Sequence, residues 1–411
     1  MPFDLYRRDA TLALRNVMRQ GRRSLFALVI IAGGVIAYMM AGGFIQWIFD
    51  SMRESTIRAQ LGHVQVVRPE FFEKGIADPY RYLLPSDDPL FSTLSQAEGV
   101  LAVAPRLIFT GLISHDDSTI SFSGEGVDPD KEHDLSRYLV ILEGAPLDAS
   151  DPNGIVVGEG LAANLGAKVG DTVVMLASTP KGGLSGVECK IRGIFMTATK
   201  AYDDAYLRAP IGVARQLSRV SGATSWVLLL DHTDRTDEFI ARESARANRK
   251  DVQFIPWHDL ADFYKKTVKL LSTQVGGVEI LIALIIVLSI SNTLSMAVIE
   301  RTGEIGTIMA LGGRRHSVLR LFVLEGAILG CIGGVIGTAL GTLIAQVITH
   351  IGIPMPPPPG MTRGFDGQIH ITLAIVGEGF LLAFGTTVLA SIFPAWKASR
   401  MNIVDALRHQ R

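Results

Sequence analysis

Four long stretches of apolar residues, nearly free of charge, alternate with polar segments along the chain. They cover residues 24–49, 275–299, 317–348 and 371–393. Because a helix rises about 1.5 Å per residue, about 20 apolar residues cross a bilayer. The pattern therefore predicts four transmembrane helices.

The first stretch, SLFALVIIAGGVIAYMMAGGFIQWIF, has 26 residues without a charge. A signal-peptide core has only about 7 to 15 apolar residues and is followed by small residues at a cleavage site. No such site follows this stretch, so we expect it to remain as an uncleaved anchor.

Residues 50–274, between the first two stretches, have the pattern of a folded domain. β-type runs lie at 63–67, 154–157, 172–176 and 226–230, and helical patterns lie at 160–165 and 236–249. A segment of about 225 residues can bury a hydrophobic core, and one core or two subdomains both remain open. The predicted fold class is an integral membrane α-helical protein, with four transmembrane helices and a large α+β domain between helices 1 and 2.

The basic residues beside the apolar stretches predict the orientation in the membrane. The first 23 residues hold six arginines against two aspartates, and the tail at 394–411 holds four basic residues against one acid. The connection at 300–316 also carries arginines, whereas residues 51–274 hold 24 Lys and Arg against 30 Asp and Glu. Since basic residues beside spans favour the cytoplasm, we expect both termini and 300–316 inside. Residues 50–274 and the loop 349–370 are then outside.

The segment 1–23 contains an amphipathic helical pattern at residues 5–22. Apolar residues recur on one side and arginines on another: the apolar set is Ala10, Leu14, Val17 and Met18, and the basic set is Arg8, Arg15, Arg19 and Arg22. Such a helix lies in the membrane interface, with its apolar side among acyl chains and its guanidiniums among headgroup phosphates. The alternative is a basic flank that only sets the topology; we favour the interfacial helix.

Composition and motifs exclude several classes of function. The chain has 411 residues, of which 48% are hydrophobic and 19% charged, and its net charge of -1 gives no field that attracts nucleic acid. It lacks a Gly-Lys dipeptide and therefore a phosphate-binding GxxxxGK[ST] loop. HExxH, CxxC and GxSxG are also absent, and the two cysteines, Cys189 and Cys331, lie in unlike contexts. We therefore expect a non-catalytic protein without a metal or cofactor of its own.

The third apolar stretch is rich in glycine at a spacing of four residues. Two overlapping series share one side of the predicted helix: Gly326, Gly330 and Gly334, and Gly333, Gly337 and Gly341. Small residues on one side let two helix backbones approach closely where lipid supplies no hydrophobic drive. We expect tight helix packing here, against a neighbour in this chain or in a second subunit.

Each of the last three apolar stretches contains one acid, namely Glu279, Glu325 or Glu378. A charge deep in a bilayer is costly and is usually paired or exposed to a water-filled cavity. Glu325 lies near the cytoplasmic end of its stretch, with Arg320 close by in the sequence. We favour a structural or snorkelling role over proton or substrate handling, because no Asp, His or Lys joins these acids in a relay.

The connection at 300–316, ERTGEIGTIMALGGRRH, predicts a short amphipathic helix that Gly312 and Gly313 end. Its apolar residues are Ile305, Ile308, Met309 and Leu311, and its polar residues are Glu300, Arg301 and Glu304. We expect these residues to couple the chain to a separate cytoplasmic motor, with the apolar side chains in a groove of that motor. The alternative is a helix that only caps the second and third spans against the membrane surface.

Several of these segments resemble one family. The run ERTGEIGTIMALGGRRHSVLRLFVLEGAILGCIGGVIGTALG and the closing FPAWKASRMNIVDALR are similar to the FtsX-type permease domain of ABC systems. The opening LALRNVMRQGRRSLFALVIIAGG and the run GIVVGEGLAANLGAKVGDTVVM resemble MacB and LolC/LolE-type permeases and their periplasmic core domain. GHVQVVRP favours the lipoprotein-releasing LolC/LolE-like branch. The Pro-rich segment MPPPPG at 355–360 departs from the family pattern, and, unlike in MacB, we expect no fused nucleotide-binding domain.

The resemblance implies a mechanotransmission (type VII) permease subunit in the bacterial inner membrane. Its partners would be a cytoplasmic ABC ATPase dimer, which binds the ATP and Mg, and a second permease copy or a homologous sister subunit. A periplasmic adaptor or acceptor is a further candidate partner. The implied function is the extraction or export of a lipoprotein, lipid or amphiphile. The alternative is an FtsX-like signalling permease that activates a periplasmic partner such as a cell-wall hydrolase.

Overall fold

A computed structural model of the chain describes residues 2–19, 21–132, 135, 139–197, 200–355 and 365–401. Apart from Met355, the predicted Pro-rich segment 355–360 lies outside the described residues, and so does most of the predicted tail 394–411. The chain divides into two compact units. One contains residues 1–49, 268–356 and 365–411, and the other contains residues 50–267 and 357–364.

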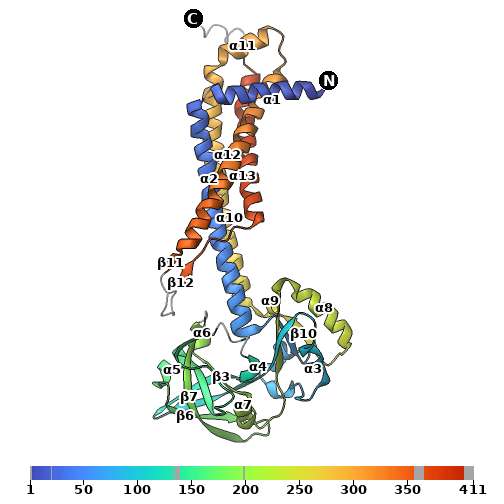
Figure 1. Cartoon of the computed structure of the whole chain (residues 1–411), viewed down its shortest axis with the longest axis vertical. Coiled ribbons are helices and arrows are strands. Elements are labelled where there is room, and N and C mark those ends of the chain that lie inside the picture. Colours follow the sequence, from blue (N-terminus) through green and yellow to red (C-terminus); the bar gives the residue numbers. More distant parts are fainter. Residues whose placement is uncertain are drawn as a thin grey trace. The chain divides into compact units, whose positions relative to one another are not determined.

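The first unit is a helix bundle with a two-stranded antiparallel sheet (Figure 1). Its elements are α1 (Pro2–Arg19), α2 (Gly21–Thr56), α10 (Asp262–Glu300), α11 (Thr302–Ala310), α12 (Arg315–Ile351), β11 (Ile353–Met355), β12 (Phe365–Gly367) and α13 (Leu373–Ser399). Four of these helices, α2, α10, α12 and α13, are long and apolar enough to cross a membrane. The predicted four-helix membrane architecture is therefore confirmed.

Two of the spanning helices are much longer than the apolar stretches that predict them. Helix α2 continues to Thr56 and then into a π-helical turn at Ile57–Leu61, whereas its apolar stretch ends at residue 49. Helix α10 begins at Asp262, although its apolar stretch begins at residue 275. The extra turns are polar. Hydropathy therefore predicts the part of each helix that crosses the membrane, but not the ends of the helix. Both helices thus continue into residues of the second unit.

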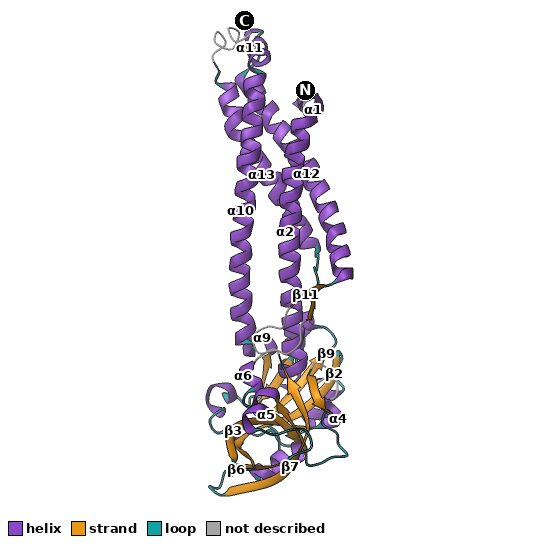
Figure 2. Ribbon diagram, turned by 90° about the vertical axis from the view of Figure 1, so that its left-hand side faces the viewer, coloured by secondary structure: helices purple, strands orange, loops and turns teal. Residues whose placement is uncertain are grey.

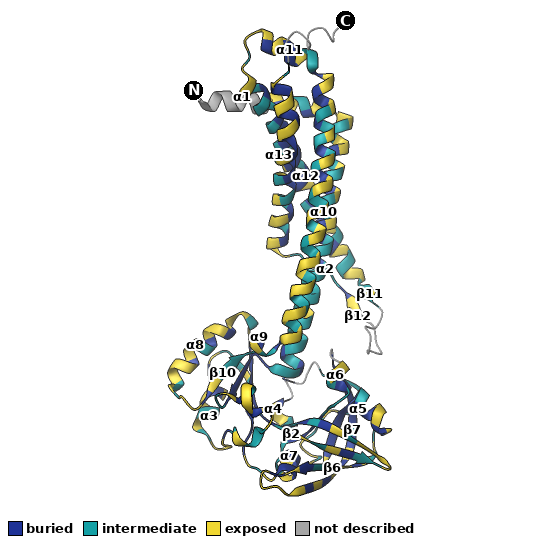
Figure 3. Ribbon diagram, turned by 180° about the vertical axis from the view of Figure 1, so that it is seen from behind, coloured by how far each residue is buried: buried dark blue, intermediate teal, exposed yellow. Residues whose placement is uncertain are grey.

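The bundle buries one side of each helix and exposes apolar side chains on the other (Figure 3). Its core contains Ala27, Ile31, Val35 and Met39 of α2, Ile286, Ile290 and Leu294 of α10, Leu329 of α12, and Ile375, Ala383 and Ala390 of α13. Leu281, Leu284 and Leu288 of α10 are exposed. An exposed apolar face on a spanning helix is what contact with acyl chains requires.

The second unit is an α+β domain whose strands form a single ten-stranded sheet (Figure 2). The strands are β1 (Val64–Val67), β2 (Val100–His115), β3 (Ser118–Val127), β4 (Val140–Gly144), β5 (Gly154–Gly158), β6 (Thr172–Ser178), β7 (Leu184–Met196), β8 (Tyr206–Pro210), β9 (Ser225–Leu230) and β10 (Gln253–Pro256). Their order is β10-β1-β9-β2-β3-β8-β5-β7-β4, and β6 pairs with both β2 and β7. The four β-type runs predicted from the sequence lie in β1, β5, β6 and β9.

The pairing of β6 with two strands closes part of the sheet into a ring. The ring runs β2-β3-β8-β5-β7-β6 and returns to β2 through the register Leu112 opposite Leu176. The closure needs a small residue at Gly111, because a Cβ there would collide with the carbonyl oxygen of Leu176. A closed ring leaves its member strands without an unpaired edge at the closure.

Of the hydrophobic cores in this unit, two belong to different lobes and resolve the question of subdomains. The core of the ring comes from residues between Leu107 and Leu217. A second core, around Trp226, comes from residues 64–103 and 223–252. The ring is therefore an insertion within the second lobe, and strand β2 passes through both. The chain leaves one lobe and later returns to it, and the amino-acid composition does not change at either point. The boundary between the lobes therefore could not be predicted from the sequence.

Short helices cover the sheet. They are α3 (Pro89–Ser95), α4 (Pro129–Glu132), α5 (Glu159–Leu165), α6 (Lys200–Asp203), α7 (Ile211–Ser218), α8 (Thr236–Ala247) and α9 (Trp257–Leu260), with a π-helical turn at Phe71–Gly75 and 3-10 turns at Pro79–Arg81 and Thr233–Arg235. The helical patterns predicted at 160–165 and 236–249 correspond to α5 and α8.

His63, directly before β1, is a buried residue of the interior. Its side chain is 1% exposed, and the backbone N–H of Leu230 donates to its Nδ1 at 3.0 Å. Nε2 therefore carries the proton and donates to Oγ1 of Thr233 at 3.0 Å. Burial lowers the pKa of His63 to about 4, against a weaker opposing effect of Glu54.

This histidine predicts a loss of stability in acid. The unfolded chain takes up a proton at His63 near pH 6.5, whereas the folded chain does so only near pH 4. The free energy of unfolding should therefore fall by about 3 kcal/mol between pH 7 and 4, and His63→Gln should remove that part of the pH dependence. Thermal unfolding of the full-length protein across this range measures the effect.

The pH dependence of His63→Gln must be compared with that of wild type, because Asp203 also titrates in this range. It is 3% exposed, and burial raises its pKa to about 6, so it contributes a pH dependence of opposite sign over the same range. Wild type and His63→Gln share this contribution. Parallel pH curves for the two proteins would contradict the assignment to His63.

Candidate coupling site at the α11 end of the helix bundle

Helix α11 is held against the bundle by an apolar cluster of its own. Ile305 and Met309 pack with Val318 and Phe322 of α12, and the cluster is completed by Val298, Ala395 and Ala398. Ile305 is 4% exposed and Met309 is 7% exposed. These two side chains are therefore not presented to a partner, which corrects the expectation that all four apolar residues form one docking face.

The exposed apolar residues of the loop are Ile308 and Leu311. Ile308 is 45% exposed, and Leu311, directly after α11, is 85% exposed. Three residues apart, Ile308 and Ile305 are neighbours round the helix, so Ile308 lies at the edge where the buried side meets the exposed one. An apolar face of this kind fits a groove in a partner, and sequence periodicity did not separate it from the buried side because α11 is only nine residues long.

Glu325 of α12 is the centre of a buried polar network beside α11. It is 4% exposed, and its Oε1 accepts hydrogen bonds from Nδ2 of Asn16 at 2.7 Å and from Nη1 of Arg301 at 2.9 Å. A buried ion pair with an added hydrogen bond is satisfied, whereas loss of one partner leaves a charge without compensation. Glu325 therefore joins α1, the α10–α11 junction and α12.

The network continues to the surface through Arg301 and Glu304. Nε of Arg301 donates to Oε2 of Glu304 at 3.1 Å, and Nη2 of Arg19 donates to Oε1 at 2.7 Å. The hydrogen bond from Arg19, followed by that from Arg301, lowers the pKa of the Glu304 carboxyl. Arg23 pairs with Glu300 through both guanidinium nitrogens.

The three polar residues predicted for coupling thus pair within the chain. Arg301 is buried, while the side chains of Glu300 and Glu304 remain 42% and 48% exposed. Sequence reasoning missed Asn16 and Arg23, because the hydrogen bonds from these residues connect positions 309 and 277 apart. The sequence feature that pointed to this region was the cluster of arginines before the first span.

The glycines of α12 meet two neighbours, both in this chain. A Cβ at Gly326 would lie 2.6 Å from Cβ of Ser391, and one at Gly334 would lie 2.9 Å from the ring of Phe380. A Cβ at Gly330 would collide with the hydroxyl of Thr387. This series faces α13.

The second series faces α2. A Cβ at Gly333 would lie 2.7 Å from Ile31, and one at Gly341 would lie 2.7 Å from Sδ of Met39. At Gly337 the contact includes backbone: 2.7 Å to Cβ of Val35, 3.0 Å to Cα of Ala32 and 3.1 Å to its carbonyl oxygen. Helix α12 therefore lies between α13 and α2 at close backbone distance.

Gly337→Ile should force α2 and α12 apart. The nearest atoms of Ala32 are backbone and cannot turn away, so the variant should lose about 1–3 kcal/mol of stability or more. Thermal unfolding in detergent is the measurement. Gly385→Ile on α13 is the matched control, because no atom lies within 4 Å of a Cβ there. Equal melting temperatures for the two variants would show that the α2–α12 contact is not tight.

Glu378 of α13 accepts a hydrogen bond from the hydroxyl of Tyr38 of α2, with 2.7 Å between the oxygens. Tyr38 is buried, whereas Glu378 is exposed on the bundle. The tyrosine gives this carboxylate one fixed partner within the chain. Glu279 of α10 is partly exposed.

In the second unit, the α+β domain of residues 50–267, two buried arginines bind the end of the first long helix. The π-helical turn Ile57–Leu61 leaves carbonyl groups that no helical N–H can reach. Nη2 of Arg208 donates to the carbonyl oxygen of Ala59 at 2.7 Å, and Nη1 of Arg106 donates to that of Gln60. The arginines lie on β8 and β2, so the sheet is bonded directly to the helix end.

Acids compensate the two arginine charges. Arg106 makes a two-pronged ion pair with Glu132 of α4, and Nε of Arg208 donates to Glu125 at 3.1 Å. Arg106, Arg208 and Glu132 are each no more than 3% exposed. Loss of one member would leave a buried charge without a partner, so these ion pairs keep the turn at 57–61 bonded to β2 and β8.

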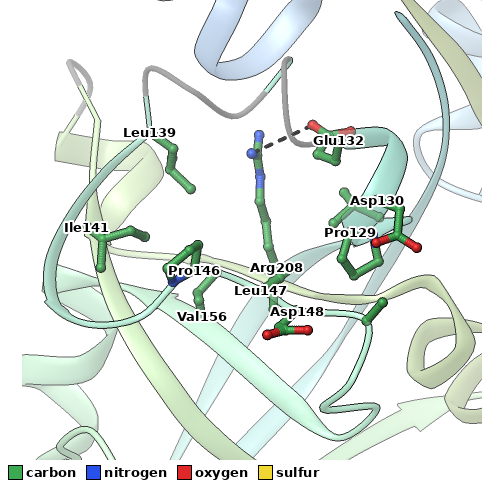
Figure 4. Close-up of a pocket in the computed structure, with 12 residues that line it drawn as sticks. Pro129, Asp130, Glu132, Leu139, Ile141, Pro146, Leu147, Asp148, Val156 and Arg208 are labelled. Atoms are coloured by element: carbon green, nitrogen blue, oxygen red, sulfur yellow. Dashed lines mark ion pairs between the residues drawn. The ribbon is translucent and has the colours of Figure 1, made fainter.

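A mostly apolar cavity of about 520 Å³ lies beside this cluster (Figure 4). Arg208 extends along it toward Glu132, and the two are joined by a 3.9 Å ion pair. The apolar lining residues are Val127, Pro129, Leu139, Ile141, Pro146, Leu147, Ala149 and Val156. Among the described lining residues, the charged ones are Asp130, Glu132, Asp148 and Arg208, and Asp148 is itself paired with Arg192.

Two known protein families match most of the chain. Residues 24–243 match the MacB-like periplasmic core domain, and residues 278–403 match the FtsX-like permease C-terminal domain. The first match alone spans more than half of the 411 residues.

Relatives of three kinds have similar sequences. An uncharacterized ABC transporter permease of Methanocaldococcus jannaschii is 27% identical over 65% of this chain and 65% of its own length. The lipoprotein-releasing system transmembrane protein LolC of Xylella fastidiosa is 25% identical over 69% of this chain and 72% of its own. The macrolide export ATP-binding/permease protein MacB of Marinobacter nauticus is 25% identical over 97% of this chain and 60% of its own.

Proposed function

Because the chain belongs to the ABC transporter permeases that combine a MacB-like periplasmic core domain with an FtsX-like permease domain, we propose that it transmits force from a separate ATPase to its soluble domain. The observation that carries this proposal is the exposed apolar pair Ile308 and Leu311 on a loop tied to the bundle by the Glu325 network. The partner ATPase, as a dimer, binds ATP and Mg, since this chain has no phosphate-binding loop.

In this proposal α11 and both chain ends are cytoplasmic, and residues 50–267 are periplasmic. The support is the excess of arginine before the first span and in the 300–316 connection. The membrane is the inner membrane of a bacterium.

Cysteine labelling tests this orientation. In a Cys189→Ala/Cys331→Ala background, an impermeant maleimide applied to intact spheroplasts should modify a cysteine at the exposed Lys181 and leave one at the exposed Thr307 unmodified. Permeabilised cells should expose both. Modification of Thr307→Cys in intact spheroplasts would show that the orientation is opposite to the one proposed.

The route of force follows the contacts of the bundle. Closure of the ATPase dimer moves α11, which is bonded through Arg301 to Glu325 of α12 and packed on Phe322. Helix α12 lies against α2 and α13 at its glycines, so these helices move with it. Helices α2 and α10 continue beyond the spans, and Arg106 and Arg208 bond the end of the first to the sheet.

The substrate class that we propose is a lipoprotein, lipid or other amphiphile, handled at the outer leaflet by two such subunits, either two copies or a copy and a sister. The names of LolC and MacB, for lipoprotein release and macrolide export, support an amphiphilic cargo. A periplasmic adaptor or acceptor would receive the cargo.

Reconstitution tests the function. The full-length chain, its ATPase and any sister subunit are placed in proteoliposomes loaded with a fluorescent lipoprotein. We expect ATP-dependent release into the medium, and none with a hydrolysis-deficient ATPase. The complex could instead hydrolyse ATP without releasing lipoprotein or lipid and activate a periplasmic cell-wall hydrolase. That result would contradict transport and support a signalling function.

A further inference from the structure

Helix α1 lies across the ends of the spanning helices instead of continuing their direction (Figure 1). A helix set crosswise to membrane-spanning helices runs along the membrane plane. Its location beside α11 puts it at the level where the spans leave the bilayer, because α11 connects the ends of α10 and α12.

The described part of α1 has three distinct sides. Successive residues of a helix are about 100° apart, so residues four apart share a side. Ala13 and Val17 are buried against the bundle. Leu14 and Met18 form one flank and are 43% and 73% exposed. Arg15 and Arg19 form a basic flank about 100° further round, roughly opposite the buried side.

The two flanks differ in what they can contact. Arg19 reaches Glu304 on α11, so the basic flank points to the same side as that loop. The apolar flank lies about 100° round the helix from these arginines, and it is exposed and free to meet acyl chains. Directly after α1, the first turns of α2 expose Leu25 and Phe26, each more than 60% exposed. An apolar flank and a basic flank on one interfacial helix are what a charged lipid surface binds.

The arginines of this region also fall into two groups. Arg19 and Arg23 are paired with Glu304 and Glu300. Within the described chain, Arg15 and Arg22 are exposed and make no ion pair. Two exposed guanidiniums beside apolar side chains provide bidentate donors for phosphate oxygens.

We propose that α1 and the first turn of α2 form a binding surface for anionic phospholipid headgroups, with Arg15 and Arg22 as the phosphate-contacting residues. The same headgroups lie next to Arg19 and Arg23, and they compete with Glu304 and Glu300 for these guanidiniums. The lipid composition of the leaflet thereby sets how firmly α1 is bonded to the α11 loop. This inference rests on the proposed function only in one respect, namely which leaflet of the membrane the surface contacts.

Retention of lipid by the full-length protein tests this surface. The protein is purified in mild detergent from mixed phosphatidylglycerol and phosphatidylcholine, and the bound lipids are quantified by mass spectrometry. Near an anionic surface each arginine strengthens binding roughly fivefold. Arg15→Gln/Arg22→Gln should therefore retain several-fold less phosphatidylglycerol with phosphatidylcholine unchanged. Arg15→Lys/Arg22→Lys should retain most of it, because the charge remains.

The matched control removes the same charge elsewhere. Arg235→Gln/Arg246→Gln changes two exposed arginines of the soluble domain and should retain phosphatidylglycerol as wild type does. Equal retention by the α1 variant would overturn the proposal. Loss of ATPase binding with unchanged lipid retention would also overturn it, because the surface would then bind a protein. The lipid measurement uses neither ATP nor ATPase, so its failure is separate from failure of the coupling proposal.

Discussion

An aspartate at Leu311 is expected to abolish stable binding of the partner ATPase. Leu311 is 85% exposed and Ile308 is 45% exposed, and burial of such a side chain in a groove stabilises a complex by about 1.5–3 kcal/mol. A carboxylate at the same place must be desolvated without a partner. Together these effects should raise the dissociation constant by about 100-fold. Affinity measurement between the detergent-purified permease and its ATPase detects the change.

Two variants separate docking from folding. Leu184→Asp places the same charge on a residue of the soluble domain that is 77% exposed, and it should leave ATPase binding at the wild-type level. Ile305→Asp puts a carboxylate into the buried cluster with Phe322, so it should lower the thermal stability of the permease itself. Wild-type affinity of a stable Leu311→Asp protein would mean that the loop only caps the membrane surface.

The second large effect is expected at Glu325. Glu325→Gln removes the buried charge beside Arg301 and leaves it only the half-exposed Glu304; removal of one member of a buried pair costs about 3–5 kcal/mol. The variant should melt at a lower temperature and lose ATPase stimulation. Glu300→Gln breaks the exposed pair with Arg23, which is worth at most about 1 kcal/mol.

A double replacement distinguishes a structural role from a coupling role. Arg301→Met/Glu325→Met substitutes an apolar pair for the ionic one and should recover most of the lost stability. It should still fail to stimulate hydrolysis, because the hydrogen bond from Asn16 and the bond to Glu304 are gone. A stable double variant with full coupling would show that the network only holds the bundle together.

The bundle was largely predictable, because the relevant signals are local. Apolar runs mark the spans, and a four-residue glycine period marks the packed side of α12. What periodicity lacks is the identity of the neighbour: Gly330 meets Thr387 and Gly333 meets Ile31, which are far apart in the chain. For the same reason the sequence pointed to Arg320 beside Glu325, whereas the bonds come from Arg301 and Asn16.

The soluble domain was harder to predict. Strands β5 and β9 are buried along their whole length and stand out as apolar runs. Strand β2 has a mixed pattern, because its two halves serve different lobes, and β3 is largely Ser, Thr and Gly. The closure of the ring between β2 and β6 depends on one close approach at Gly111, which no local pattern marks.

The transmission of ATPase motion to the soluble domain is tested most directly by hydrogen exchange in the assembled complex. Exchange rates are measured for residues 50–267 of the full-length chain, without nucleotide and with a non-hydrolysable ATP analogue. We expect the analogue to change exchange in the turn at 57–61 and in strands β2 and β8, whose Arg106 and Arg208 hold that turn. The change should be absent in the Leu311→Asp complex. Identical exchange with and without analogue, in a wild-type complex shown to bind the analogue, would contradict force transmission.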